Sequence, residues 1–392
     1  MRKIAVLSGI SIISLFVLIM AMINPVNETD RSSVKVSSHQ EIAHSVVDER
    51  TVNTSLTLNA VGDILIHDRV YDGAHTDDGF DFKSMLEPIK PYLEGGDLIF
   101  ANQETILGGE EIGLSGYPTF NSPFEVGDAL KYAGVDIVSI ANNHTLDRGE
   151  EAVMNATNYL NDIGIDYVGG YQSDQDQQTK RVINKNGISV GFLAYTYGTN
   201  GIPIPDGKDY LVNLIDEQRI IEDIHNMQEE TDFVIVSMHF GQEYQPLPND
   251  EQIHLTELLT SEGADVILGH HPHVLQPIDW FSFNDQNQFV IYSLGNFLSG
   301  QRGLERKIGA ISQVELTKEI TKETISYDVV NAKVMPTYNY YEDHEDVLID
   351  LQVMPLIEAD EFDLDEAEKL FDDTVDHIKS FSSDVKIVPY FD

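Results

Sequence analysis

The chain has 392 residues, 42% of them hydrophobic, which is enough for one large domain or two ordinary ones. Aspartate and glutamate total 66 against 24 lysines and arginines, so the formal net charge is −42. Such a surface repels nucleic acid and excludes nucleic-acid binding as a function class. There is no cysteine, so any metal would be bound by His, Asp, Glu and Asn.

The chain begins with a basic pair followed by an uncharged apolar run. Arg2 and Lys3 precede Ile4–Ile23, which is long enough to span a bilayer as a helix. The run ends in a poor cleavage site, so a transmembrane anchor over residues 1–24 is favoured over a cleavable signal peptide. The basic pair would stay in the cytoplasm and place the rest on the extracellular side of the cell membrane. Residues 25–54 are polar and predict an extracellular stalk.

From residue 55 onward, short apolar runs alternate with amphipathic stretches, which predicts an α/β fold over residues 55–340. Several apolar runs are continuous, as in strands covered on both faces. Residues 341–392 are very acidic and predict a C-terminal extension with one helix. The predicted strands are Leu56–Val61, Asp97–Ala101, Asp136–Ile140, Ser189–Tyr195, Asp232–Met238, Ala264–Leu268 and Gln288–Leu294. The predicted helices are Pro123–Ala133, Glu150–Ile163, Asp216–Glu229, Glu251–Glu262 and Asp365–Phe381.

Polar side chains follow five of the predicted strands at the point where each strand ends. Because open α/β sheets bind ligands at the carboxyl ends of their strands, we expect these side chains to converge. One histidine in such a place often caps a strand, but recurrence at five strands favours a metal site. Imidazole, carboxylate and amide ligands without sulfur suit zinc, manganese, iron or magnesium. The residues at these ends are Asp63, His67, Asn102, Glu104, Asn142, Asn143, His144, Asp147, His239, Glu243, Tyr244, His270, His271 and His273.

These motifs resemble the CapA family of poly-γ-glutamate capsule synthesis proteins. The resemblance covers about residues 55–300, and its specific blocks are Asn142-Asn143-His144-x-x-Asp147 and Gly269-x-His271-Pro272-His273. CapA-like domains are similar in turn to calcineurin-type metallophosphoesterases. The resemblance therefore implies a sandwich of two mixed sheets flanked by helices, with one or two divalent metal ions. The other blocks are Gly62-Asp63, Asn102-x-Glu104, His239-x-Gly241-x-Glu243-Tyr244 and Tyr292-Ser293-Leu294-Gly295-Asn296-Phe297.

The resemblance also implies roles for the residues in these blocks. His144 would be the general acid, oriented by Asp147. Apart from the resemblance, the position of Glu243 and Tyr244 just after His239 fits either contact with substrate or a packing role, whereas Asn296 is expected to make a turn rather than a ligand contact. The implied metal ligands are Asp63, His67, Asn102, Glu104, Asn143, His239, His271 and His273, with Glu104 or Asn102 bridging two metals.

The sequence departs from the phosphoesterase pattern at two places. Asp63-x-x-x-His67 replaces Asp-x-His, which leaves His67 open as a ligand. Asn102 and Glu104 stand where phosphoesterases have Asp, so sites with one metal or two both remain open. His270 is the weakest histidine candidate, because His271 and His273 match the family pair better.

Three functions fit this sequence. The resemblance implies a membrane-anchored extracellular protein for poly-γ-glutamate synthesis or export, with the polymer and a polyglutamate synthase complex as partners. The alternatives are a metal-dependent hydrolase of an envelope phosphoester or polymer amide, and a binding module. No glycine-rich nucleotide loop is present, so ligase chemistry would belong to another protein. Because the polymer and this surface are both anionic, tight binding would require local positive charge.

Overall fold

The chain divides into two units, Met1–Asp48 and Glu49–Asp392. A computed structural model describes residues 51–283 and 286–391, all of them in the second unit. The predicted anchor over residues 1–24 lies outside the described residues, as does the predicted stalk up to residue 50. Within the described ranges, no helix is long and apolar enough to cross a membrane.

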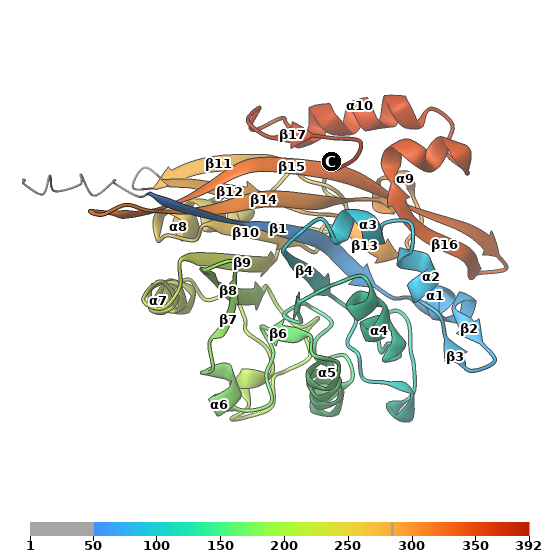
Figure 1. Ribbon diagram of the computed structural model, residues 1–392. Coiled ribbons are helices and arrows are strands. Elements are labelled where there is room, and N and C mark those ends of the chain that lie inside the picture. Colours follow the sequence, from blue (N-terminus) through green and yellow to red (C-terminus); the bar gives the residue numbers. More distant parts are fainter. Residues whose placement is uncertain (1–50, 284–285, 392) are drawn as a thin grey trace, which may run out of the picture. The chain divides into compact units, whose positions relative to one another are not determined.

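The first sheet is built around strand β1 (Val52–Leu65) and has nine strands (Figure 1). On one side of β1 the strands are parallel, and on the other side they are antiparallel. Two short strands pair with this sheet outside its main strand order: β13 (Asn296–Ser299) pairs with the end of β1, and β17 (Lys386–Ile387) pairs with β15. The parallel strands are β4 (Leu98–Gln103), β5 (Ile137–Ser139) and β6 (Asp166–Val168), and the antiparallel strands are β14 (Ile308–Ile320), β15 (Ile325–His344) and β16 (Val347–Pro355).

The second sheet has six strands in the order β11-β12-β10-β9-β8-β7. Its four inner strands run parallel to one another, and β7 and β11 are antiparallel edges. A separate two-stranded ribbon joins β2 (His75–Thr76) and β3 (Gly79–Phe80). The strands of the second sheet are β7 (Arg181–Lys185), β8 (Ile188–Thr196), β9 (Phe233–His239), β10 (Val266–His270), β11 (Ile278–Phe283) and β12 (Gln286–Ile291).

The two sheets pack face to face over a shared apolar core. Phe100 of β4 and Phe192 of β8 stack in this core with ring centroids 6.1 Å apart. Neighbouring side chains of β1 point to opposite faces, so Ala60 enters this core while Val61 enters the core under the helices of the first sheet. The strand is therefore buried on both faces from Leu58 onward.

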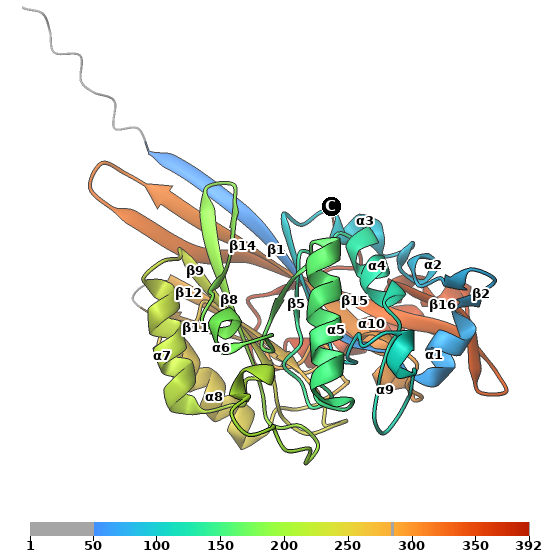
Figure 2. The same ribbon diagram turned by 90° about the horizontal axis from the view of Figure 1, so that it is seen from below.

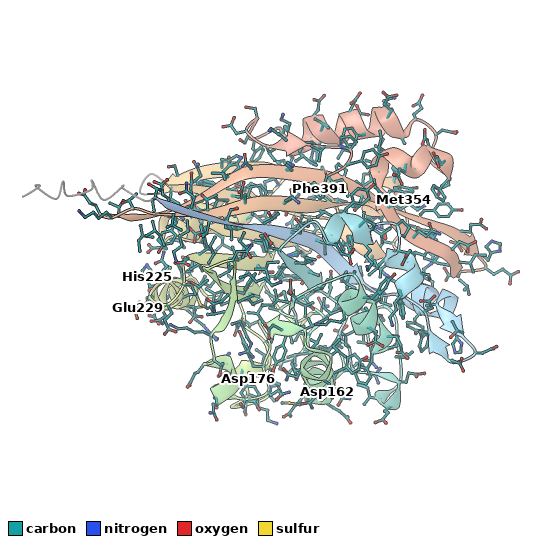
Figure 3. All side chains as sticks on the ribbon, viewed as in Figure 1. Asp162, Asp176, His225, Glu229, Met354 and Phe391 are labelled. Atoms are coloured by element: carbon teal, nitrogen blue, oxygen red, sulfur yellow. The ribbon has the colours of Figure 1, made fainter. Side chains whose placement is uncertain are left out.

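Helices cover the outer faces of both sheets (Figure 1, Figure 2). Asp162, His225 and Glu229 project outward from these helices, where they contribute to the charged surface (Figure 3). The helices on the first sheet are α1 (Asp68–Gly73), α2 (Lys83–Leu86), α3 (Lys90–Leu93), α4 (Glu125–Tyr132) and α5 (Gly149–Ile163), and α7 (Glu217–Gln228) and α8 (Asp250–Ser261) pack on the second. Shorter or peripheral helices are α6 (Asp174–Gln177), α9 (Leu304–Lys307), α10 (Ala367–Ile378) and the 3-10 turns Glu110–Ile112, Asp209–Leu211 and Leu356–Glu361.

The mixed α/β prediction is confirmed, and each predicted strand and helix has a counterpart within a few residues of its expected bounds. The long antiparallel strands β14, β15 and β16 were not predicted. Residue 340, the expected end of the main domain, falls inside β15, which continues to His344. The acidic residues after it form a β-turn and then β16, so part of the expected extension belongs to the first sheet.

Candidate metal centre

The carboxyl ends of β1, β4, β5, β9 and β10 meet at one place. Gly62 allows this meeting on the β1 side, because a Cβ added there would lie 1.9 Å from the carbonyl oxygen of Gly295. The backbone NH of Asp63 donates to that same carbonyl at 2.9 Å. The glycine of the Gly-Asp motif therefore lets the segment before β13 approach β1 closely.

Asp63 is fully buried and lies between three side chains. Asn102 Nδ2 donates to Asp63 Oδ1 at 2.8 Å, and His273 Nδ1 contacts Oδ2 at 3.0 Å. His270 Nδ1 lies 3.4 Å from Oδ1, as an ion-pair contact rather than a well-formed hydrogen bond. Burial raises the pKa of Asp63, but the two imidazoles outweigh it and hold the pKa well below its usual value. Asp63 is therefore a carboxylate at neutral pH.

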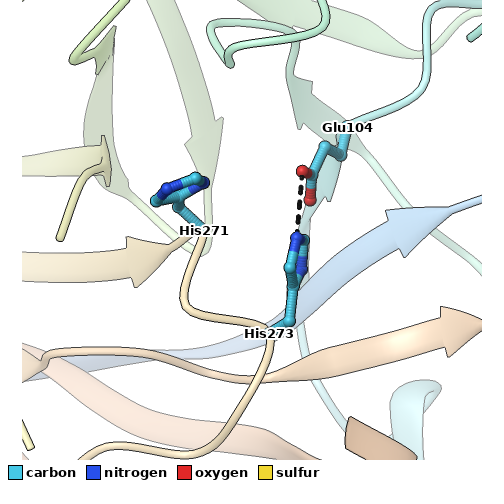
Figure 4. Close-up of side chains that lie close together, drawn as sticks. All are labelled: Glu104, His271 and His273. Atoms are coloured by element: carbon cyan, nitrogen blue, oxygen red, sulfur yellow. Dashed lines mark ion pairs between the residues drawn. The ribbon is translucent and has the colours of Figure 1, made fainter. Parts of the chain in front are cut away.

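Glu104 is also fully buried, but neither of its carboxyl oxygens accepts a hydrogen bond. Its Oε1 lies 3.6 Å from His273 Nε2 and 3.8 Å from His239 Nε2. Ligand atoms of Glu104, His271 and His273 all lie within 4.8 Å of one another (Figure 4). The same is true of the ligand atoms of Asp63, Glu104 and His239. Burial raises the pKa of Glu104 well above its usual value, opposed by His273 and reinforced by Asp63. The two overlapping triads share Glu104.

His271 and His273 stand on a strained loop that follows β10. Their φ angles are +95° and +60°, a region that residues with a Cβ adopt rarely and mainly at functional sites. Burial, reinforced by the charge of His273, lowers the pKa of His271 to about 3. Burial also lowers the pKa of His273, but Glu104 and Asp63 raise it to a net value of about 9. The strained loop thus turns two imidazoles toward the same carboxylates.

The loop after β5 supplies the remaining predicted residues. Asn143 Oδ1 contacts His239 Nε2 at 2.9 Å. His144 Nδ1 contacts Asp147 Oδ2 at 2.6 Å, and that oxygen also accepts the backbone NH of Phe120 at 2.7 Å. Asn142 fixes the loop, since its Nδ2 donates to the Gln103 carbonyl at 2.9 Å and its Oδ1 accepts the NH of His144. Asp147 is therefore positioned to orient the His144 ring.

Three predicted residues line a cavity of about 360 Å³ beside the cluster rather than the cluster itself: His67, Glu243 and Tyr244. His67 was expected as a metal ligand, but its Nδ1 contacts the Leu65 carbonyl at 3.3 Å and it belongs to neither triad. Burial lowers the pKa of His67 to about 4. The two additional residues in Asp63-x-x-x-His67, compared with Asp-x-His, carry the ring out of the cluster and into the cavity. His144 and His273 line this cavity too, so it opens onto both groups.

The structure adds two residues to this region and gives a third a larger part than expected. Asn296, expected to make a turn, contacts His273 Nδ1 through Oδ1 at 3.2 Å and lies opposite Asp63 in the β1–β13 pairing. Asn200 accepts from Asn143 Nδ2 at 3.2 Å. His270, the weakest histidine candidate in the sequence, is fully buried against Asp63. Asn296 had a signal in the sequence because it stands in the Tyr292–Phe297 block, whereas Asn200 had none.

The donor set fits a divalent metal ion. In the part of the chain that the structure describes, eight of the thirteen buried polar atoms without a hydrogen-bond partner belong to Asn102, Glu104, Asp147, His239, His270 and His271. Burying polar atoms without partners is unfavourable unless something else satisfies them. Nitrogen and oxygen donors without sulfur suit zinc, manganese, iron or magnesium. The fold and this cluster define an α/β sandwich protein with a candidate metal centre at its strand ends.

The family model of the bacterial capsule synthesis protein PGA_cap matches residues 57–301, and the chain belongs to this family. The capsule biosynthesis protein CapA of Bacillus anthracis is 28% identical over 274 residues, which cover 67% of this chain and 64% of that protein. The chain thus matches slightly less than two thirds of that relative. The PGA biosynthesis protein CapA of Bacillus subtilis (strain 168) is 29% identical over 285 residues, with 68% and 69% covered.

Solved structures resemble the chain more distantly. A 5′-nucleotidase precursor from Thermus thermophilus has 13% identity and a TM-score of 0.43, covering 70% of this chain and 54% of that one. A calcineurin-like phosphoesterase from Bacillus subtilis has 16% identity and a TM-score of 0.38, covering 73% and 91%.

Proposed function

We propose that this protein acts in the synthesis or export of a poly-γ-glutamate capsule and does so through a divalent metal centre. One observation carries the proposal: the segment that matches the capsule family, residues 57–301, contains the whole cluster from Asp63 to Asn296. The names of the two Bacillus relatives, which refer to capsule and PGA biosynthesis, support the polymer.

The metal would be held by residues of both triads. Asp63, Glu104 and His239 offer one set of ligand atoms, and His271 and His273 complete the other. The His273 Nδ1 contacts with Asp63 and Asn296 leave Nε2 directed toward Glu104, which is the orientation a ligating imidazole needs. Asn143 and Asn102 add amide oxygens at the margin. A divalent ion bound here would polarise an oxygen of the substrate.

We further propose that the protein works at the outer face of the cell membrane, held by the apolar segment over residues 1–24 and near the polyglutamate synthase complex. The basic pair Arg2 and Lys3 supports this orientation. Protease added to intact cells should then digest the chain from the outside. Complete protection in intact cells together with digestion after lysis would contradict the orientation.

Complementation tests the capsule role. A strain lacking the gene should lose surface poly-γ-glutamate, and the wild-type gene should restore it. Glu104→Gln should fail to restore it, because the variant lacks the shared carboxylate. Glu222→Gln, which removes an exposed carboxylate on α7, should restore it fully. Normal surface polymer in the deletion strain would overturn the capsule role, and full rescue by Glu104→Gln would overturn the role of the cluster.

A second function, hydrolysis of a phosphoester or polymer amide, is favoured by the His144–Asp147 pair. Asp147 accepts from Nδ1, so Nε2 of His144 can carry a proton at the cavity that His144 lines. In hydrolysis, the oxygen of water would bond to the phosphorus or the carbonyl carbon and the bond to the leaving group would break. His144 Nε2 would give its proton to the leaving group, and the proton released by the water would return to His144 through solvent.

Turnover assays test this second function. His144→Gln should lower kcat about 100-fold or more with metal content unchanged, whereas His225→Gln, an exposed histidine paired with Glu262, should change neither. Absence of turnover with every divalent ion, in a protein that retains bound metal, would leave the capsule role standing and remove hydrolysis.

A further inference from the structure

The cavity beside the cluster gathers positive charge in a protein that has very little of it. Only 24 of the 392 residues are lysine or arginine, yet Arg69, Arg302 and Arg306 all line this cavity. Two carboxylates, Glu243 and Asp346, line it as well. The charge available to an incoming ligand depends on which of the three guanidinium groups already has a carboxylate partner.

Arg306 is the arginine whose charge is not used within the fold. Arg69 and Arg302 both pair with Asp343, and Arg302 also reaches Asp346 at 2.7 Å. Among the residues that the structure describes, Arg306 forms no ion pair, either with Glu243 or with any other carboxylate. Its guanidinium carbon instead lies 4.5 Å from the centre of the Tyr244 ring. The guanidinium is half-buried, and its contact with Tyr244 leaves further N–H donors for an oxyanion.

Hydrogen bonds tie this arginine and tyrosine to the metal cluster. The NH of Tyr244 donates at 2.8 Å to the carbonyl of Pro272, between His271 and His273. Asn296 Oδ1 contacts His273, and its Nδ2 donates to the Arg306 carbonyl at 2.9 Å. One asparagine therefore holds both a candidate ligand and the backbone of Arg306. The distance from the arginine to the cluster is set by the fold rather than by a mobile surface loop.

We propose that Arg306, stacked on Tyr244, is the subsite that holds a carboxylate of an anionic substrate, namely an α-carboxylate of a γ-linked glutamyl chain. This deepens the proposed function and rests on it for the identity of the polymer. A protein with a net charge of −42 repels such a polyanion as a whole. A guanidinium without a carboxylate partner in the cavity would therefore direct binding to the region near His273 and Glu104. Residue 306 lies beyond the family-matched segment, which ends at residue 301.

Titration calorimetry on the full-length protein tests the subsite, with a short γ-linked glutamate oligomer and inorganic phosphate as separate probes. Arg306→Gln should weaken oligomer binding about tenfold or more, and Arg306→Lys should weaken it less, because lysine keeps the charge but loses the fork of donors. The matched control is Arg219→Gln on α7, which removes the same charge far from the cavity and should bind like wild type. Metal content and melting temperature should be unchanged in all three variants.

The outcomes separate this subsite from the metal centre. After chelation, the affinity for the oligomer should still depend on Arg306. The subsite can therefore be tested even if the protein binds no metal, and failure of the metal proposal would be seen separately in the metal content. Wild-type affinity in Arg306→Gln, equal weakening in Arg219→Gln, or no binding of the oligomer by wild type would each overturn the subsite. Arg306-dependent binding of phosphate but not of the oligomer would overturn its assignment to a carboxylate.

Discussion

Strand β1 carries two buried polar regions with opposite hydrogen-bonding states. Toward its amino-terminal half, Asn59 is fully buried and satisfied: its Nδ2 donates to the carbonyls of Leu93 at 3.0 Å and Tyr92 at 3.3 Å, and its Oδ1 accepts from Gln313 at 3.1 Å. At its carboxyl end, Asp63 sits beside Glu104, whose two buried oxygens have no hydrogen-bond partner. Asn59 and Glu104 are equally buried, but only Asn59 has hydrogen-bond partners for its polar atoms.

Hydrogen bonding distinguishes a buried polar residue that stabilises the fold from one that is a candidate for function. A satisfied buried amide stabilises the fold, and its loss leaves other groups without partners. A buried carboxylate that accepts no hydrogen bond destabilises the folded protein. Its presence is accounted for if a bound cation interacts with its oxygens. Substitutions in the two regions should therefore have opposite effects.

The largest effect is expected for Glu104→Gln. Loss of the carboxylate that both triads share should lower metal affinity by about 1,000-fold, beyond the 10- to 100-fold that loss of an outer partner typically produces. The chelated protein should lose little stability, because a neutral amide is easier to bury than a carboxylate that accepts no hydrogen bond, which offsets the loss of the 3.6 Å ion-pair contact with His273. Competition titration with a chromophoric chelator measures the affinity, with Glu222→Gln as the control. Unchanged affinity would mean that Glu104 is not a ligand.

Asn59→Ala should show the reverse pattern. It leaves the Tyr92 carbonyl and the Gln313 amide without this partner, while the Leu93 carbonyl keeps its bond from the NH of Gly96, so the free energy of unfolding should fall by about 2–3 kcal/mol. Metal affinity should stay as in wild type. Urea unfolding measures the change, and Asn226→Ala at an exposed position provides the control. Loss of metal from a folded Asn59→Ala protein would remove the distinction between the two regions.

The smallest effect concerns Asp265, a buried carboxylate that the protein satisfies in part and that lies apart from the cluster. Burial raises the pKa of Asp265 to about 7, opposed by a hydrogen bond from the NH of Val234 at 2.7 Å. The folded pKa exceeds the unfolded value, so Asp265 favours folding when protonated, and this contribution is lost as pH rises from about 4 to 7.

Asp265→Asn should therefore be more stable than wild type at pH 8 by about 1–2 kcal/mol, with the advantage shrinking toward pH 5. The Gln286 amide, which donates to Asp265, can turn its oxygen toward the new Nδ2. Urea unfolding of both proteins across this pH range gives the difference. A difference that does not vary with pH would show that Asp265 does not titrate as stated.

Part of the site could be predicted because parallel strands end at one edge of a sheet. That rule placed Glu104 beside Asn143 on the first sheet and His239 beside His270 on the second sheet. The meeting of the two edges, where His239 lies near Glu104 and Asn143, depends on the packing of one sheet on the other and could not be predicted from the strands alone. The rule did not place His67, because His67 lies beyond the end of β1, in the connection to α1, whose path the sequence does not indicate. Asn296 could not be placed, since its position depends on β13 pairing with β1 across more than 200 residues.

The same limit applies to the fold. The buried parallel strands are continuous apolar runs and were predicted, whereas β15 mixes Lys333, Asp328 and tyrosines with apolar residues over twenty positions. Both ends of β15 are exposed, so the strand contains no long apolar run from which it could be predicted. The acidic stretch around Glu342–Asp346 suggested an extension, but it is the end of β15 followed by the turn into β16, where charge is readily solvated.

The most direct test is anomalous scattering from crystals of the protein grown with manganese. We expect an anomalous peak about 2–2.5 Å from Glu104 and from nitrogen atoms of His271 and His273, with Asn59 and its neighbours unaffected. Ordered density for Glu104 hydrogen-bonded directly to His273, with no anomalous peak at saturating manganese, would contradict the metal centre.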